Sequence, residues 1–171
     1  MLSKKRKFSK IYDQCIDKIY RFIFLKVSSE EIAQDLCSET FLKAWKSYKN
    51  NSKIDNPSAF LYRIARNLVV DHYRKKGRTQ FVSLDSVPVF DSNPGIEEKA
   101  ALNSDLERVR TSLIKLKEDY QNVIIWHYLD DLPIPKVAKM LEKSEQATRV
   151  TLFRALKALR EEIEKRDVKE G

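Results

Sequence analysis

The fold of the C-terminal part is decided by residues 132–159, LPIPKVAKMLEKSEQATRVTLFRALKAL, which predict two short helices around a tight turn. Glu142 and Lys143 form the turn. Ser144 suits the N-cap of the second helix, because its hydroxyl can accept a hydrogen bond from an otherwise unpaired backbone N–H. This arrangement is typical of a helix-turn-helix, whose second helix enters the major groove of DNA. An ordinary pair of packed helices fits the same residues about as well.

Helical spacing separates a buried face of this stretch from an exposed one. In the first helix, Val137, Ala138 and Leu141 share the inward face. In the second helix, the residues expected inward are Ala147, either Val150 or Thr151, Ala155 and Leu159. The residues expected outward are Arg149, Phe153, Arg154 and Lys157.

The composition favours a mostly helical protein in one domain or two small ones. The 171 residues contain only 3 glycines and 5 prolines, fewer than turn-rich sheet folds usually need. Cys15 and Cys37 lie inside helical patterns, which favours a reduced interior over a disulfide framework. No apolar run approaches the roughly 20 residues that span a membrane, and the basic start lacks the apolar core of a signal peptide. We therefore expect a cytoplasmic protein.

The net charge of +8 is unevenly distributed along the chain. Residues 1–80 hold 18 Lys/Arg against 8 Asp/Glu, whereas residues 105–171 hold 14 against 13. The basic surplus therefore lies outside the helix-turn-helix. It suggests a second contact with a polyanion, because neutralising phosphates releases counterions and drives association. A Lys-rich surface that serves only solubility is the plainer alternative.

Three helices are predicted in the first half. The first covers residues 8–27, and the second runs from the cap at Ser28 and Ser29 to about Tyr48. The third begins at Pro57 after an Asn cap, runs to about Lys76, and ends at Gly77. Residues 78–96 break every periodic pattern. We therefore predict an all-α protein with two small helical domains, 1–78 and 97–171, joined by a flexible linker over 79–96.

The third helix carries arginines with interleaved aromatic residues opposite its apolar stripe. The residues assigned to this face are Tyr62, Arg63, Arg66, Asn67, Tyr73 and Arg74, followed by Lys75, Lys76 and Arg78. Guanidinium groups hold phosphates, and flat rings stack on unpaired bases for roughly 1–3 kcal/mol per base. The pattern therefore favours binding to single-stranded or opened DNA.

An acidic ridge, Glu31, Asp35 and Glu39, interrupts the basic half at a spacing of four. Lys43 extends the row as an ordinary intrahelical partner of Glu39. The ridge predicts either a docking site for a basic protein or a solvated face.

No motif in the sequence indicates a metal, a cofactor or a catalytic nucleophile, and His72 and His127 lack matching ligand residues. We expect no enzyme, no small-molecule substrate and no cofactor. His72 lies beside the basic tract, where it could touch phosphate, and His127 is expected to pack or cap.

In this order the segments resemble the extracytoplasmic-function (ECF) class of bacterial RNA polymerase sigma factors. The resemblance rests on DLCSETFLKAW at 35–45, PSAFLYRIARNLVVDHYRKK at 57–76 and, past the linker, FRALKALRE at 153–161. It covers nearly the whole chain, from about Phe8 to Ile163. It implies a transcription-initiation subunit that binds core RNA polymerase and promoter DNA.

The resemblance implies a role for each group of residues. Asp35, Ser38 and Glu39 match the segment that docks on core polymerase, with Ser38 where the family usually has Gln. The loop at 49–57, including Asn50 and Asn51, matches the loop that captures a flipped base of the −10 element, and the third helix matches the strand-opening surface. Arg149, Val150, Phe153 and Arg154 match the helix that reads the −35 element, with Val150 where the family commonly has Ser.

The resemblance also implies that a cognate anti-sigma factor could hold the chain inactive. The residues are also compatible with two other classes of protein. A stand-alone helix-turn-helix regulator would bind duplex DNA without polymerase. An enzyme acting on nucleic acid would need acids on the DNA-facing side of the third helix, where Asp71 is the only one.

Overall fold

The computed structural model describes residues 2–51, 53–79 and 107–170, which form two compact units. Every regular element in these ranges is helical, which confirms the predicted all-α class with two helical units. The predicted linker at 79–96 lies outside the described residues except for Thr79, and so do residues 97–106. None of the helices in these ranges combines the length and apolarity that crossing a bilayer requires.

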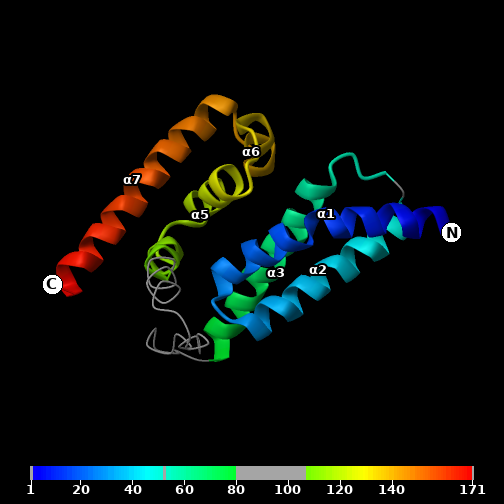
Figure 1. The fold of residues 1–171 in the computed structure, drawn as a ribbon, viewed down its shortest axis with the longest axis horizontal. Helices are drawn as coiled ribbons and strands as arrows, with labels where there is room; N and C mark the ends of the chain where they lie inside the picture. The colour runs from blue at the N-terminus through cyan, green and yellow to red at the C-terminus, as the bar shows by residue number, and fades with distance from the viewer. Residues whose placement is uncertain (1, 52, 80–106, 171) are drawn as a thin grey trace, which may run out of the picture. The chain divides into compact units, whose positions relative to one another are not determined.

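The first unit is built from three helices that pack against one another (Figure 1). They are α1 (Leu2–Val27), α2 (Glu30–Asn50) and α3 (Pro57–Thr79). Their shared core holds Ile19, Phe22, Ile23, Ala33, Phe41, Ala44, Leu61, Ala65 and Leu68. Burying each large apolar side chain contributes about 1.5–3 kcal/mol, so this interface accounts for the compactness of the unit.

The predicted caps start two of these helices. The Ile32 N–H donates to Ser29 Oγ at 3.3 Å, with Glu30 and Glu31 in the first turn of α2. The Ala59 N–H donates to Asn56 Oδ1 at 3.2 Å, directly before the proline that opens α3. Both caps satisfy N–H groups that have no partner inside the helix.

Three helix ends differ from the prediction. α1 begins at Leu2 instead of Phe8, because the lysines and arginine between them are good helix formers and nothing there breaks a helix. α2 extends to Asn50, two residues beyond Tyr48. α3 continues through Gly77, whose Cα faces open space. A glycine at an exposed helical position costs about 1 kcal/mol relative to alanine, which weakens a helix without ending it.

The second unit contains a helical segment over 107–114, then α5 (Glu118–Ile124), η1 (Ile125–Leu129), α6 (Ile134–Leu141) and α7 (Glu145–Glu170). The helical stretch from Glu118 to Leu129 is divided, because its last turn widens into the π-helix η1. The Asp130 N–H donates to the Ile125 carbonyl at 3.0 Å, and His127 Nδ1 donates to the Leu132 carbonyl at 2.9 Å. His127, which is expected to pack or cap, is half-buried and bonded to the loop that follows η1.

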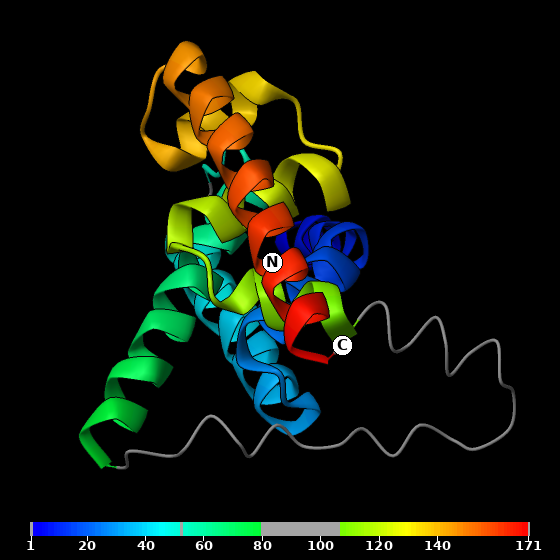
Figure 2. The ribbon, with the colours of Figure 1, turned by 90° about the vertical axis from the view of Figure 1, so that its left-hand side faces the viewer.

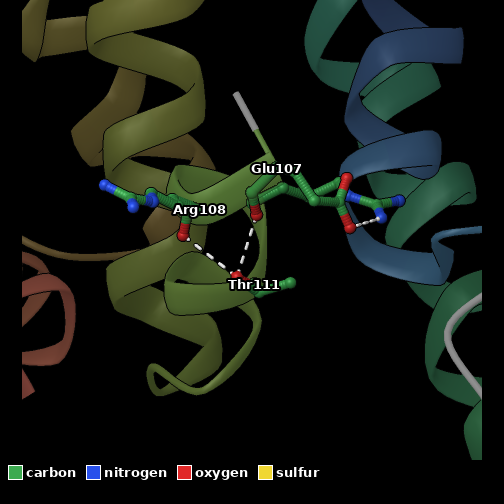
Figure 3. A network of polar contacts seen from close by, with 4 residues as sticks. Glu107, Arg108 and Thr111 are labelled. Atoms are coloured by element: carbon green, nitrogen blue, oxygen red, sulfur yellow. Dashed lines mark hydrogen bonds and ion pairs between the residues drawn. The ribbon is translucent and has the colours of Figure 1, made fainter. Parts of the chain in front are cut away.

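One ion pair joins the segment 107–114 to α7, and two further hydrogen bonds lie within the segment. Arg108 forms an ion pair with Asp167 of α7 at 3.6 Å. The hydroxyl of Thr111 donates to the carbonyls of Glu107 and Arg108 at 2.8 and 3.1 Å, as Figure 3 shows. α7 runs unbroken past this segment, from orange to red in Figure 2. One long helix therefore carries both the predicted recognition residues and a structural C-terminal end.

Candidate nucleic-acid interface

The turn between α6 and α7 has the predicted geometry. Glu142 ends α6 in the left-handed conformation, with φ 56° and ψ 41°, and the Lys143 N–H donates to the Ala138 carbonyl at 3.0 Å. Ser144 caps α7, because its Oγ accepts from the Ala147 N–H at 3.1 Å. The tight turn sets α6 and α7 against each other, and their contact completes a helix-turn-helix.

The buried side of α7 is formed by Thr148, Thr151 and Ala155. Both threonine hydroxyls donate to carbonyls one turn earlier, at 2.8 Å, so neither is left unpaired in the core. Of the two candidates Val150 and Thr151, it is therefore the threonine that is buried. The inward placement of Ala147 is wrong, because Ala147 is exposed and the next residue, Thr148, faces the core.

The outward side of α7 carries the four residues predicted there, and all are exposed: Arg149, Phe153, Arg154 and Lys157. Val150 is exposed beside them. Gln146 is a further exposed polar residue on this side, missed from the sequence because it lies in the first turn near the cap. The Arg149 guanidinium lies 3.7 Å from the Glu145 carboxylate. The exposed side chains of this side form the recognition face: Gln146, Arg149, Val150, Phe153, Arg154 and Lys157.

On α3, one exposed line contains Arg63, Asn67 and Arg74, at spacings of four and seven. Arg66 is half-buried, and Lys75 is exposed near the end of the helix. The side chains of this line are open to solvent. Asn50, the last residue of α2, and Asn51, its C-cap, are also exposed on the connection that leads to α3.

Two aromatic residues of the predicted face are placed differently. Tyr62 is only 1% exposed, and its ring meets that of Phe22 edge-on at 5.4 Å, so its predicted placement on the DNA-facing side is wrong. Tyr62 lies seven residues before the buried Val69 and shares its face, which contacts α1. Tyr73 is 44% exposed, and its hydroxyl donates to the carbonyl of Lys26.

His72 lies half-buried between these groups. Burial lowers its pKa, and the neighbouring Lys76 ammonium lowers it further. A lowered pKa favours the neutral imidazole near pH 7, which can still donate one ring N–H to a phosphate. The phosphate contact of His72 therefore stays a prediction.

The acidic ridge lies on the exposed side of α2. Glu31, Asp35, Ser38 and Glu39 are exposed, and Lys43 pairs with Glu39 at 3.5 Å as predicted. Beside the ridge is a groove of about 370 Å³ lined by Tyr12, Ile16, Tyr20, Gln34, Cys37, Ser38 and Phe41. Ser38 belongs to both, so the acids border an apolar surface. Among the described residues, no cluster of His, Cys, Asp and Glu could hold a metal ion.

Two family models match the chain, one in each unit. The model for Sigma-70 region 2 matches residues 11–79, and the model for Sigma-70 region 4 matches residues 106–159. Together they cover the three-helix unit and the helix-turn-helix, in the order expected from the sequence.

Curated relatives agree with these matches. The ECF RNA polymerase sigma factor BldN of Streptomyces coelicolor is 30% identical over 162 residues, which is 89% of this chain and 58% of BldN. The chain thus spans little more than half of that relative. The ECF RNA polymerase sigma factor SigW of Bacillus subtilis is 28% identical, over 91% of this chain and 88% of SigW.

Solved structures share the fold. In the complex of the sigma factor RpoE with the anti-sigma factor NepR from Bartonella quintana, the match has a TM-score of 0.73 at 22% identity. It covers 93% of this chain and 98% of the other. CnrH, solved with the cytosolic domain of CnrY, matches with a TM-score of 0.65 at 22% identity, over 91% and 86% of the two chains.

Proposed function

This chain belongs to the extracytoplasmic-function class of RNA polymerase sigma factors, and we propose on that premise that it binds core RNA polymerase and directs it to promoters with recognisable −35 and −10 elements. The observation that carries the proposal is the presence of two different exposed basic faces in one chain, one on α3 and one on α7. The line on α3 suits opened strands, and the recognition face of α7 suits duplex DNA.

The first unit is assigned to polymerase docking and promoter opening. The docking site consists of Asp35, Ser38 and Glu39, since they are exposed together on α2 and border the groove.

The DNA at the −10 element is held by α3. The contacting residues are Arg63, Asn67 and Arg74, with Arg66 and Lys75 beside them. Tyr73 keeps an exposed part of its ring for stacking, whereas buried Tyr62 has no such role. Asn50 and Asn51 contact the −10 element at the start of the connection to α3. Unstacking a base costs a few kcal/mol, which these contacts offset.

The second unit is assigned to the −35 element. The recognition face presents Arg149, Val150, Phe153 and Arg154 on α7, held at a fixed angle by the capped turn. Arginine reads guanine edges and phosphates, so this face can both position the helix and discriminate bases.

We also propose a cognate anti-sigma factor as a partner. RpoE and CnrH, whose folds this chain shares, were each solved in complex with a partner: the anti-sigma factor NepR for RpoE and the cytosolic domain of CnrY for CnrH. A protein covering the ridge of α2 would block polymerase docking. The chain works in the cytoplasm, where polymerase and DNA meet, and supplies binding and positioning while the core enzyme supplies the chemistry.

The test is co-purification of the tagged full-length protein with bacterial core RNA polymerase, followed by run-off transcription on sheared genomic DNA. Stable association with promoter-selective transcripts is expected. A protein that does not associate with the core enzyme but binds specific duplex DNA alone would be a stand-alone regulator, and the proposal would be abandoned.

A further inference from the structure

An apolar pair, Val150 and Phe153, occupies the centre of the recognition face. Phe153 is 71% exposed and Val150 is 45% exposed. The core side of α7 is formed by Thr148, Thr151 and Ala155. With about 100° of rotation per residue, Phe153 points almost directly away from that core. These two side chains therefore contribute little to the packing of the unit and are free to contact a ligand.

Cations surround this pair on the same helix. Arg149, Arg154 and Lys157 are all exposed within about one turn of Phe153. An apolar patch ringed by positive charge suits a ligand that presents small apolar groups between two rows of negative charge. The major groove of DNA has this layout, because its floor carries the base edges and its rims carry the phosphates.

The chemistry of valine limits which groups in the major groove Val150 can contact. Valine offers no hydrogen-bond donor or acceptor, so it cannot distinguish bases by their polar edges. The apolar group on the base edges of the major groove is the 5-methyl group of thymine. Residues three apart on a helix lie about 5–6 Å from each other, and base pairs rise about 3.4 Å each.

Resting on the proposed function, we propose that Val150 and Phe153 select −35 elements by packing on the 5-methyl groups of thymines one or two base pairs apart. Arg149 and Arg154 hold the flanking phosphates or guanines and fix the register of α7. The preference for thymine methyl groups is then a property of this apolar pair and not of the charge of the face.

The experiment uses the reconstituted holoenzyme with the full-length chain and a promoter recovered by run-off transcription. Each thymine of the −35 element, on either strand, is replaced singly by deoxyuridine, which removes the methyl group and leaves the pairing intact. Binding of the holoenzyme to each duplex is measured for the wild-type chain, Val150→Ala, Phe153→Ala and Val168→Ala. Val168 is the matched control, since it is 80% exposed near the far end of the same helix.

One or two uridine substitutions are expected to weaken wild-type binding about fourfold each, since a buried methyl-sized group is worth about 0.8 kcal/mol. Val150→Ala and Phe153→Ala should each weaken binding of the holoenzyme to the thymine promoter. At one position of the −35 element, replacing thymine by uridine should then cause no further loss of binding by that variant. Val168→Ala should match the wild type throughout.

Three results would overturn the inference. Uridine without effect at every position would exclude methyl contacts. Equal sensitivity of the wild type and both alanine variants would assign the effect to DNA shape. If the alanine variants bound the thymine promoter like the wild type, Val150 and Phe153 would not contact DNA, and a protein partner would be their ligand. A holoenzyme that makes no promoter-selective transcript instead refutes the proposed function, and the two failures are therefore distinguishable.

Discussion

The hydroxyl of Tyr73 donates a hydrogen bond to the backbone carbonyl of Lys26, 47 positions earlier in the chain. Lys26 lies in the last turn of α1, where carbonyls have no partner inside the helix. The bond therefore caps the end of α1 from α3. Burial also raises the pKa of the Tyr73 hydroxyl, which keeps it protonated as a donor. A residue predicted for DNA contact thus has a structural role in the first unit.

Replacing Tyr73 by Phe should separate these two roles. The variant loses the hydrogen bond, and a net loss of about 1 kcal/mol in the free energy of unfolding is expected by urea unfolding. It keeps the ring, so holoenzyme transcription from a duplex promoter should remain. Tyr73→Ala should reduce that transcription and recover part of it on a template with a pre-opened bubble. If Tyr73→Phe abolished duplex transcription as fully as Tyr73→Ala, stacking by the ring would be excluded as its role.

Because the thiol of Cys37 is buried, we expect the free energy of unfolding to fall at alkaline pH. Burial raises the pKa of this thiol from the ordinary value near 9 to about 11. Between these values the unfolded chain releases the proton and the folded chain retains it, so stability falls as pH rises from 9 to 11. The expected loss is on the order of 1 kcal/mol, because the thiol also borders a groove open to water.

Urea unfolding at pH 7, 9 and 10 checks this for the wild type and Cys37→Ala. The pKa values of Tyr20 and Tyr73 are also raised, from 10, so their contributions begin above that pH. A difference between the two proteins that grows from pH 9 to 10 belongs to Cys37. If the free energy of unfolding fell equally with pH in both proteins, Cys37 would not be the cause of the loss.

Glu142 predicts a stabilising substitution. It holds φ 56° without being glycine, at the position where helices commonly end in a left-handed glycine. Glu142→Gly should relieve this strain and raise the free energy of unfolding by about 1 kcal/mol. Glu142→Ala is the control, because it removes the same charge and keeps the strain. A thermal midpoint that rose equally in both variants would assign the gain to charge.

Local chemistry made several features of this fold predictable. Ser29, Asn56 and Ser144 act as caps through neighbours three residues away, and such contacts need no tertiary information. The Glu39–Lys43 pair is local in the same way. The π-helical turn at Ile125 was not predictable, because its Trp126 is fixed by packing within the unit and no residue in the segment signals a wider turn.

The rotational phase of a helix was harder to predict than its existence. An error of one residue rotates a face by about 100°, and this separates buried Thr148 from exposed Ala147. Tyr62 was misplaced for a related reason. α3 contacts both α1 and α2, so its buried arc is wider than the narrow stripe expected from periodicity and includes Tyr62 beside Val69. The candidate site could be located from sequence, but its aromatic members depended on the packing partners of α3.

The ion pair between Glu145 and Arg149 predicts a variant with tighter DNA binding. Glu145→Gln frees the guanidinium, and it also removes a carboxylate that repels phosphates. An exposed pair of this kind is worth about 0.2–1 kcal/mol, so up to about fivefold tighter binding of the holoenzyme to a −35 promoter duplex is expected. The gain should shrink as salt rises. Glu164→Gln, an exposed acid further along α7, should change nothing. Equal gains in both variants would indicate net charge alone.

The acidic ridge predicts a loss of polymerase binding without a loss of folding. Asp35 and Glu39 are exposed, so Asp35→Asn with Glu39→Gln leaves the core of α2 intact. At an interface with a basic partner, removing two charges should weaken core polymerase binding about a hundredfold or more, since each contacting charge contributes about 1.5 kcal/mol or more. The matched control is Asp13→Asn with Asp17→Asn, two exposed acids at the same spacing on α1. The control raises the net charge by the same amount, so a deficit confined to the α2 variant in a binding titration locates the docking site on the ridge. Equal deficits would mean that the polymerase senses only the overall charge of this unit, and the docking assignment of Asp35, Ser38 and Glu39 would then be withdrawn.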